Sequence, residues 1–274
     1  MVLHGWAMHS TVWKPVAPQL EAVFTVSWVD LPGHGVNRDV TATSLSAVLA
    51  LLKPHIPQGT HLMGWSLGGL IAQALANELS DRINSVTCVA STPRFSQTVD
   101  WPHAMSQAVL DQFAVNLEHD LEATIKRFIA LQFMGIPEAR TLQRGLTQEI
   151  LQGLYQNPEV TDENNAFEAN IIVRTVSKSI KSGGGVLSNP QKVALKLGLD
   201  TLKGADYRQQ TLAMPQHWLV AGKDRLIPPP IRNDLKKMRP NAQISFLKNA
   251  GHAPFMTHPD EFLNVVIPFI QSHA

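Results

Sequence analysis

The chain has 274 residues, of which 44% are hydrophobic and 16% charged, so it can bury a core and is not an intrinsically disordered chain. Its formal net charge of +1 gives no long-range field toward nucleic acid or a membrane surface, and we expect neither as a partner. The single cysteine, Cys88, excludes an internal disulfide bond, and its apolar surroundings predict a buried thiol.

The cysteine count, the first ten residues and the distribution of apolar residues indicate in which compartment the protein lies. One unpaired cysteine suits a reducing cytoplasm. The first ten residues lack a basic start and an apolar stretch, so they do not form a secretory signal. No window reaches the roughly 18 apolar residues that a membrane span needs. We therefore expect a cytoplasmic protein.

The first ninety residues alternate between strand and helix patterns. Residues 23–30, 61–65 and 85–90 are short runs rich in β-branched and apolar residues, and a helical pattern follows the second run. Strands separated by helices predict right-handed crossovers and a mostly parallel sheet covered by helices on both faces. The fold class is therefore α/β.

This alternation stops near Pro93 and returns after residue 210. Residues 94–210 are mostly helical in pattern, with polar loops expected at 157–165 and 181–190. The later elements are a strand at 216–222, a helix near 229–238, a strand at 243–248 and a last helix near 259–272. We predict a core built from residues 1–93 and 211–274, interrupted by a helical lid at 94–210.

Residues Gly64 to Gly68 have the sequence GWSLG, which fits the G-x-S-x-G pattern of a nucleophile elbow. The pattern alone is weak, but an apolar strand precedes Ser66 and a helical pattern follows it, as the motif requires. In such a turn the serine sits on a strained backbone, and the glycines allow the strand and helix to approach closely. Ser66 is therefore the candidate nucleophile.

A serine hydroxyl needs a general base, and the base needs a group that orients it. The expected chain order is serine, acid, histidine. Asp224 follows the strand at 216–222 and His252 follows the strand at 243–248, so both lie where open α/β sheets place their sites. Taken alone, Asp224 could be a turn former. The strongest rival histidine, His34, precedes the serine and breaks the order.

An oxyanion hole needs two N–H donors, one of them from the residue after the nucleophile, here Leu67. The natural source of the second is the early segment Leu3-His4-Gly5-Trp6, with the amide of Trp6 as the donor. The indole of Trp6 can also pack in the core, since the amide and the ring act independently.

The segments HGW, DLPGHG, GWSLGG, GKDRLIP and GHAPF together resemble the α/β-hydrolase superfamily over the whole chain. Within it, LHGW, GWSLGGL, VASTPRFS, RFIALQFMG and GHAPFMTHPDEF are similar to the pimeloyl-[acyl-carrier protein] methyl ester esterases of biotin synthesis. The resemblance implies an α/β-hydrolase fold with a helical lid. It also implies a carboxylesterase that acts through a Ser-His-Asp acyl-enzyme mechanism without metal or cofactor.

The same resemblance assigns further residues. It implies that the substrate pocket is lined by Trp6, Ser66, Leu67, Phe128, Ile129, Ala130, Leu131, Gln132 and His252. From the residues alone, Phe128, Ile129 and Leu131 read as helix core packing. The acidic acyl-carrier protein is the expected partner, and family positions for carrier contact fall on Arg127, Arg140 and Arg144. We expect a monomer.

The chain departs from the family pattern in three places. Ala123 stands where another basic residue is expected, and Lys126 is a neighbour that could compensate. The lid is longer than expected between about 145 and 185. The chain also begins almost at the HGW segment, where the family has strands upstream. Either the start has been assigned too late or this form lacks edge strands, and a missing strand would leave the oxyanion loop less well anchored.

Two alternatives stay open at this point. The first is a general short-chain esterase, or a hydrolase of carbon–carbon bonds, on the same fold. The second is a non-catalytic ligand receptor that retains the fold, which fold alone does not exclude. Serine at position 66 argues against dehalogenases and epoxide hydrolases, which use aspartate there.

Overall fold

The computed structural model describes residues 1–155 and 188–274. Its centre is a six-stranded sheet in the order β2-β1-β3-β4-β5-β6, in which every neighbouring pair is parallel. The strands are β1 (Val2–Leu3), β2 (Trp28–Val29), β3 (Thr60–Trp65), β4 (Ile83–Val89), β5 (Gln216–Ala221) and β6 (Gln243–Leu247). Parallel pairs need crossover connections, so the alternation seen in the sequence is confirmed as an α/β architecture.

The helices fall into a core set and a set inserted between β4 and β5. The core set is α1 (Ala17–Glu21), α2 (Leu45–Leu52), α3 (Leu67–Glu78), α8 (Ile231–Met238), α9 (Pro254–Thr257) and α10 (Pro259–Gln271). The inserted set is α4 (Gln107–His119), α5 (Leu121–Gln132), α6 (Arg140–Tyr155) and α7 (Asn189–Gly204). Short 3₁₀ turns lie at η1 (Ser10–Trp13), η2 (Gly35–Asn37), η3 (Lys53–His55) and η4 (Pro137–Ala139).

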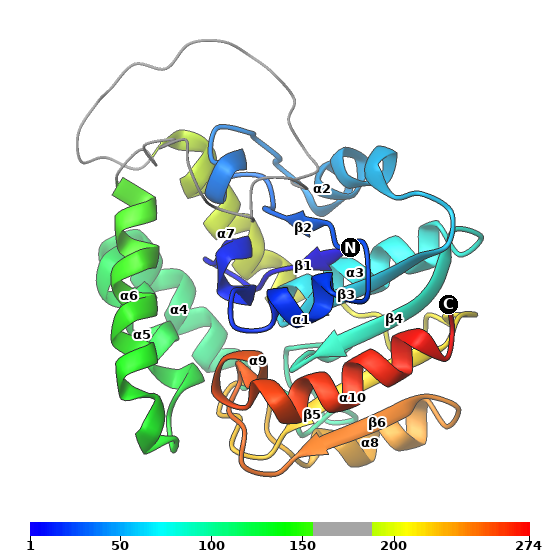
Figure 1. Ribbon diagram of the computed structural model, residues 1–274. Helices are drawn as coiled ribbons and strands as arrows, with labels where there is room; N and C mark the ends of the chain where they lie inside the picture. The colour runs from blue at the N-terminus through cyan, green and yellow to red at the C-terminus, as the bar shows by residue number, and fades with distance from the viewer. Residues whose placement is uncertain (156–187) are drawn as a thin grey trace.

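The sheet lies between two helical layers (Figure 1). Helices α1 and α10 pack together across one face, and α3 packs on β3 and β4 from the other. In Figure 1 the strand arrows point toward α4, α5 and α6, so the inserted helices stand at the carboxyl ends of the strands. Since ligands of open parallel sheets bind at that edge, the inserted helices lie where a lid would lie.

Two elements differ from the expectation. The strand expected at 23–30 is reduced to Trp28 and Val29, because its partner β1 offers only Val2 and Leu3 for pairing. The helical pattern expected from residue 94 begins only at Gln107, after a stretch with isolated bridges. The expected loop at 157–165, and residues 181–187 of the second expected loop, lie outside the described residues.

An aromatic cluster joins the early part of the chain to its last tenth. Trp13 packs on Phe255 with ring centroids 4.0 Å apart, and Trp65 meets the same Phe255 at 5.0 Å. All three side chains are fully buried. Burying an aromatic ring contributes about 1.5–3 kcal/mol. This cluster therefore fixes the segment after β6 against the end of β3.

Cys88 is buried on β4, as expected, and burial raises the pKa of its thiol. None of the helices in residues 1–155 and 188–274 combines the length and hydrophobicity that a membrane crossing needs.

The helix that follows Ser66 packs tightly on β1, and Gly68 makes this possible. A Cβ at Gly68 would lie 2.6 Å from the carbonyl oxygens of Leu3 and His4. We expect Gly68→Ala to lower the free energy of unfolding by about 1–3 kcal/mol, because backbone has to move. Gly145, inside α6, has open space around it, so Gly145→Ala should instead stabilise by about 0.5–1 kcal/mol. Urea unfolding of both variants checks this, and equal effects would contradict it.

Candidate active site

Ser66 occupies the turn between β3 and α3 in a backbone conformation that disfavours a side chain. Its φ is +54° and its ψ is −118°. Three hydrogen bonds hold the turn: its N–H donates to Val89 (3.0 Å), and its carbonyl accepts from the Gly69 N–H (2.9 Å) and the Ser91 hydroxyl (2.8 Å). A strained, non-glycine residue held this firmly is typical of a functional position.

The glycines of the motif are explained by close contacts. A Cβ at Gly64 would lie 2.1 Å from the Gly68 carbonyl oxygen, and one at Gly69, the residue just after the motif, would lie 2.4 Å from the side chain of Ser91. The strand, the turn and the helix can therefore approach closely only because these positions lack side chains. The fit to G-x-S-x-G thus has a steric basis.

Asp224 and His252 form a buried pair. Nδ1 of His252 lies 2.8 Å from Oδ2 of Asp224, and the side chains of His252 and Asp224 are 0% and 1% exposed. Oδ1 of Asp224 accepts from the N–H groups of Leu226 (2.8 Å) and Ile227 (2.9 Å). Asp224 is thus a turn former as well as the partner of the histidine. The carboxylate fixes the ring so that Nε2 is the nitrogen left for proton transfer.

Backbone bonds beyond the strand ends bring these two residues together. The N–H of Gly222 donates to Leu247 (2.8 Å), and the N–H of Lys223 donates to Ala250 (2.9 Å). A Cβ at Gly222 would lie 2.2 Å from the Lys248 carbonyl oxygen. The loops after β5 and β6 therefore run side by side as far as Asp224 and His252.

The histidine is also tied to the residue before Ser66. The indole N–H of Trp65 donates to the His252 carbonyl at 2.7 Å, and the two rings are 5.7 Å apart. Nε2 of His252 is buried and has no hydrogen-bond partner among residues 1–155 and 188–274. A buried imidazole nitrogen without a partner, held beside the serine turn, suits a base that acts on an incoming group.

Trp6 and Leu67, the expected oxyanion donors, both lie close to Gly198 on α7. A Cβ at Gly198 of α7 would lie 2.5 Å from the Trp6 ring and 3.1 Å from Leu67 Cδ2. The Trp6 indole is fully buried and donates to the Leu195 carbonyl at 2.8 Å. Leu67 opens α3, so its N–H has no acceptor inside the helix. The structure brings these two residues together.

A buried polar network, which sequence reasoning missed, supports the loop that carries Trp6. His4 Nδ1 is 2.8 Å from the Gly5 carbonyl, and its Nε2 accepts from the Leu31 N–H (3.0 Å). Asp30 accepts from the N–H groups of Ser10 (2.6 Å) and Val36 (2.9 Å). The signal was present in the HG and DLPGHG segments, whose polar residues are typical of turns and do not by themselves indicate a network.

The rival histidine, His34, belongs to this network. Its ring lies 5.1 Å from that of His4, and its Nδ1 is 3.0 Å from the Pro32 carbonyl. Burial lowers the pKa of His34. These bonds anchor the loop that carries Trp6 to the segment after β2. A missing upstream strand was expected to leave that loop less well anchored.

The lid residues at 128–132 divide into packed and polar positions. Phe128 and Ile129 are buried, with Phe128 edge-on to Trp6 at 4.8 Å, as the core-packing alternative expected. Ala130 and Leu131 are half-buried. The carbonyl of Gln132 accepts from the His252 N–H (3.2 Å). The Gln132 amide is 1% exposed and has no hydrogen-bond partner among the described residues.

The three expected carrier-contact arginines are exposed on the lid. Arg127 lies on α5, and Arg140 and Arg144 are one turn apart on α6, within the stretch 94–210 that was expected to be mostly helical. Lys126, the suggested substitute for a missing basic residue, forms an ion pair with Glu122 at 2.6 Å. Among the described residues, no cluster of three or more His, Cys, Asp or Glu side chains could hold a metal.

Comparison with known proteins places this arrangement in a family. A profile of the alpha/beta hydrolase family matches residues 1–265. The chain belongs to the alpha/beta hydrolase family. It is thus a serine hydrolase of the esterase type.

Relatives and solved structures agree with this membership. The hydrolase is 33% identical to a pimeloyl-[acyl-carrier protein] methyl ester esterase of Photobacterium profundum, over 99% of this chain and 94% of the relative. It is 32% identical to one from Chromobacterium violaceum, over 100% and 94%. A hydrolase from Oleispira antarctica superposes with a TM-score of 0.76 at 19% identity, over 98% of this chain and 89% of that one. The expected resemblance and the expected fold are confirmed.

We predict that acid destabilises the hydrolase partly through His4. Burial, with a smaller contribution from His34, lowers the pKa of His4 from 6.5 to about 3. Between these values the unfolded chain binds a proton that the folded chain does not, so stability falls as pH drops below 6.5. His4→Asn should flatten the plot of unfolding free energy against pH between 7 and 4, while the matched change at exposed His119 should not. An unaltered slope in His4→Asn would overturn the assignment.

Proposed function

We propose that this hydrolase removes the methyl group from a pimeloyl chain carried on acyl-carrier protein, a reaction of biotin synthesis. The observation that carries the chemistry is the buried Asp224–His252 pair, which a hydrogen bond joins to the indole of Trp65, the residue next to Ser66 in the chain. The substrate is suggested by the relatives called pimeloyl-[acyl-carrier protein] methyl ester esterases, which match almost the whole chain. We expect the enzyme in the cytoplasm, where its carrier would be.

The proposed mechanism needs no group beyond the chain, the ester and water. Ser66 Oγ attacks the ester carbonyl, and His252 Nε2 takes the hydroxyl proton. The amides of Trp6 and Leu67 stabilise the negative oxygen of the tetrahedral intermediate. The methoxy group leaves as methanol with the proton from His252. Water, activated by the same nitrogen, then releases the free acid and restores Ser66.

Asp224 stabilises the positive charge that His252 gains in this cycle. Its two oxygens are already engaged, one by the ring and one by the two backbone amides after it, so the carboxylate cannot rotate away. Fixing the ring orientation in advance avoids reorganisation during the reaction. Asp224 is therefore the orienting residue of the proposed triad.

The lid supplies the proposed substrate contacts. The side-chain amide of Gln132 is buried without a partner among the described residues. Gln132 follows Leu131 in the chain, and its backbone carbonyl accepts a hydrogen bond from the His252 N–H. An unsatisfied buried amide costs about 1–3 kcal/mol, which a polar group of a bound ligand would recover. Trp6 and Phe128 supply the apolar wall beside the oxyanion loop.

Carrier docking is proposed for the exposed arginines of α5 and α6. No ion pair within the described residues engages Arg127, Arg140 or Arg144, so all three are free to meet an acidic partner. Exposed pairs of this kind are screened by salt, so the carrier reaction should slow as ionic strength rises.

We predict that Ser66→Ala lowers kcat for a p-nitrophenyl short-chain ester by about 10⁴-fold or more, since the nucleophile is lost. Asp224→Asn should cost about 10³–10⁴-fold, because the ring loses its orienting acceptor. Ser46→Ala, at an exposed serine in the first turn of α2, is the matched control and should retain activity. Undiminished hydrolysis by Ser66→Ala would remove the proposed nucleophile.

We predict that Arg140→Glu combined with Arg144→Glu raises KM for carrier-bound pimeloyl methyl ester and has little effect on small esters, since only the carrier meets that surface. Arg82→Glu, at an exposed position just before β4 and hence at the opposite edge of the sheet, is the control. An equal loss on both substrates would argue against a docking role.

The physiological reaction is tested by complementation. Wild-type chain, and not Ser66→Ala, should restore growth without biotin to an auxotroph that lacks this esterase. A purified enzyme that shows no preference for the carrier-bound ester over simple esters would instead favour the general short-chain esterase.

A further inference from the structure

Helix α7 contains a glycine at a position where glycine weakens a helix. Gly198 lies in the interior of α7 and is buried, although glycine is among the residues that least favour a helix interior. A Cβ at this position would lie 2.5 Å from Cδ1 and 3.1 Å from Nε1 of the Trp6 indole, and 3.1 Å from Cδ2 of Leu67. The missing side chain therefore lets α7 lie directly against the two residues whose amides are the proposed oxyanion donors.

The same turn of α7 also holds the Trp6 ring by a hydrogen bond. The indole N–H of Trp6 donates to the Leu195 carbonyl at 2.8 Å, and Leu195 lies about one helical turn before Gly198. The Trp6 side chain is fully buried. Contact with Gly198 and the bond to Leu195 thus fix the ring against one helix.

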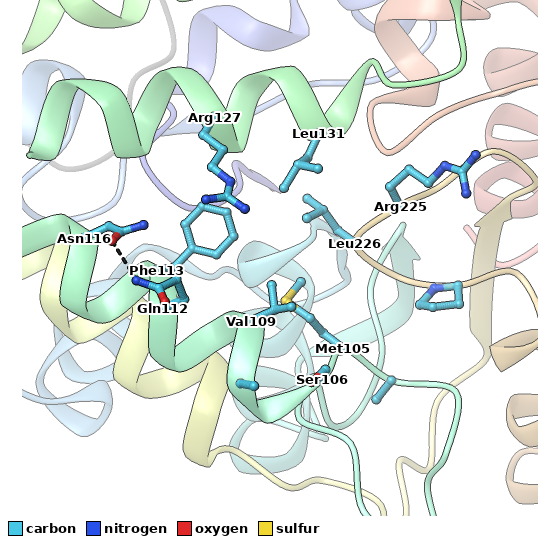
Figure 2. A pocket seen from close by; sticks show the side chains of 13 residues that line it. Met105, Ser106, Val109, Gln112, Phe113, Asn116, Arg127, Leu131, Arg225 and Leu226 are labelled. Carbon is cyan, nitrogen blue, oxygen red and sulfur yellow. Dashed lines mark hydrogen bonds between the residues drawn. The ribbon is translucent and has the colours of Figure 1, made fainter.

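Aromatic rings of α4 and α5 limit how far the indole can move. Phe128 of α5 meets the Trp6 ring edge-on at 4.8 Å, and Phe113 of α4 meets Phe128 in the same way at 5.8 Å. The Phe113 ring stands between α4 and α5 (Figure 2). Because a close-packed interior transmits a displacement, a group added at Gly198 would shift the ring of Trp6 and the backbone that carries it.

The backbone next to the Trp6 amide is strained. Ala7 has a φ of +60°, in the left-handed region that a residue with a Cβ rarely adopts. The Met8 N–H donates to the Gly5 carbonyl (3.3 Å) and closes this turn. A Cβ at Gly5 would lie 3.4 Å from the Ser66 Cβ, so the turn lies beside the proposed nucleophile. A strained turn persists only where its surroundings hold it in place.

We propose that Gly198 is a positioning residue for the proposed reaction. By lacking a side chain it lets α7 hold the Trp6 indole, and the indole holds the strained turn that aims the Trp6 amide at the substrate oxygen. This deepens the proposed function and rests on it. The amide is needed most when that oxygen becomes negative, so a displaced turn should slow the reaction more than it weakens substrate binding.

The first experiment adds a methyl group at position 198. Gly198→Ala should lower kcat for p-nitrophenyl acetate by about 10- to 100-fold and leave KM within about twofold of wild type, since a 1 Å misplacement costs about 100-fold. An alkyl trifluoromethyl ketone, whose adduct with Ser66 carries the negative oxygen, should bind more weakly by a similar factor. Gly204→Ala, at the last residue of α7, is the matched control and should keep the wild-type kcat, because a Cβ there would meet nothing within 4 Å.

A double-mutant cycle tests whether the effect passes through the indole. Trp6→Ala removes the ring and keeps the amide, so in this background a Cβ at position 198 has no ring to displace. Gly198→Ala should then have little further effect on kcat, although it slows the enzyme that retains Trp6. Equal losses in both backgrounds would show that Gly198 does not act through the ring and would overturn the proposal.

The indole bond is tested separately, and this test decides the question if Gly198→Ala does not fold. Trp6→Phe keeps an aromatic ring but removes the N–H that donates to Leu195, so kcat should fall by about three- to tenfold with KM nearly unchanged. Trp28→Phe, which loses an indole bond to Glu21, is the matched control and should keep kcat. A wild-type kcat in either Gly198→Ala or Trp6→Phe would contradict the proposal. Failure of the proposed function would appear differently, as hydrolysis of p-nitrophenyl acetate that survives Ser66→Ala.

Discussion

The hydrogen bond from the Trp65 indole to the His252 carbonyl is the contact on which the proposed site depends. It joins the end of β3, at Trp65, to a loop that follows β6, which is two strands beyond β4 in the sheet. The aromatic packing of Trp13, Trp65 and Phe255 excludes water around it, and a buried hydrogen bond is electrostatically stronger than an exposed one. Losing it would remove the direct hydrogen bond between the histidine loop and the residue before Ser66.

The other supports of the site are backbone contacts made possible by missing side chains. Gly68 lets α3 approach β1, and Gly222 lets the aspartate loop run close beside the histidine loop. Gly251 lies against the Gln132 carbonyl, which a Cβ there would approach to 2.6 Å. Each of these contacts joins segments far apart in the chain. The geometry of the proposed site thus depends on close backbone packing around Ser66, Asp224 and His252.

The sequence predicted the elements that local chemistry determines. The strand before Ser66 and the helix after it follow from an apolar run and turn residues, and the structure has both. The order of Ser66, Asp224 and His252 was predicted in the same way, and the structure pairs the last two. The strand at 23–30 was overestimated, since its length is set by the two-residue partner β1 and not by its own composition. The bonds of His4 to Leu31, and of Gln132 to His252, could not be predicted, because they depend on how distant loops pack.

The inserted helices are hydrogen-bonded through their main chain to the loops of the proposed site. The Leu195 carbonyl of α7 accepts from the Trp6 indole, and the Gln132 carbonyl at the end of α5 accepts from the His252 amide. Helices held in this way cannot move away as a rigid body without breaking these two hydrogen bonds. A wide opening would break both hydrogen bonds, so it would disturb the proposed oxyanion loop and the proposed base together.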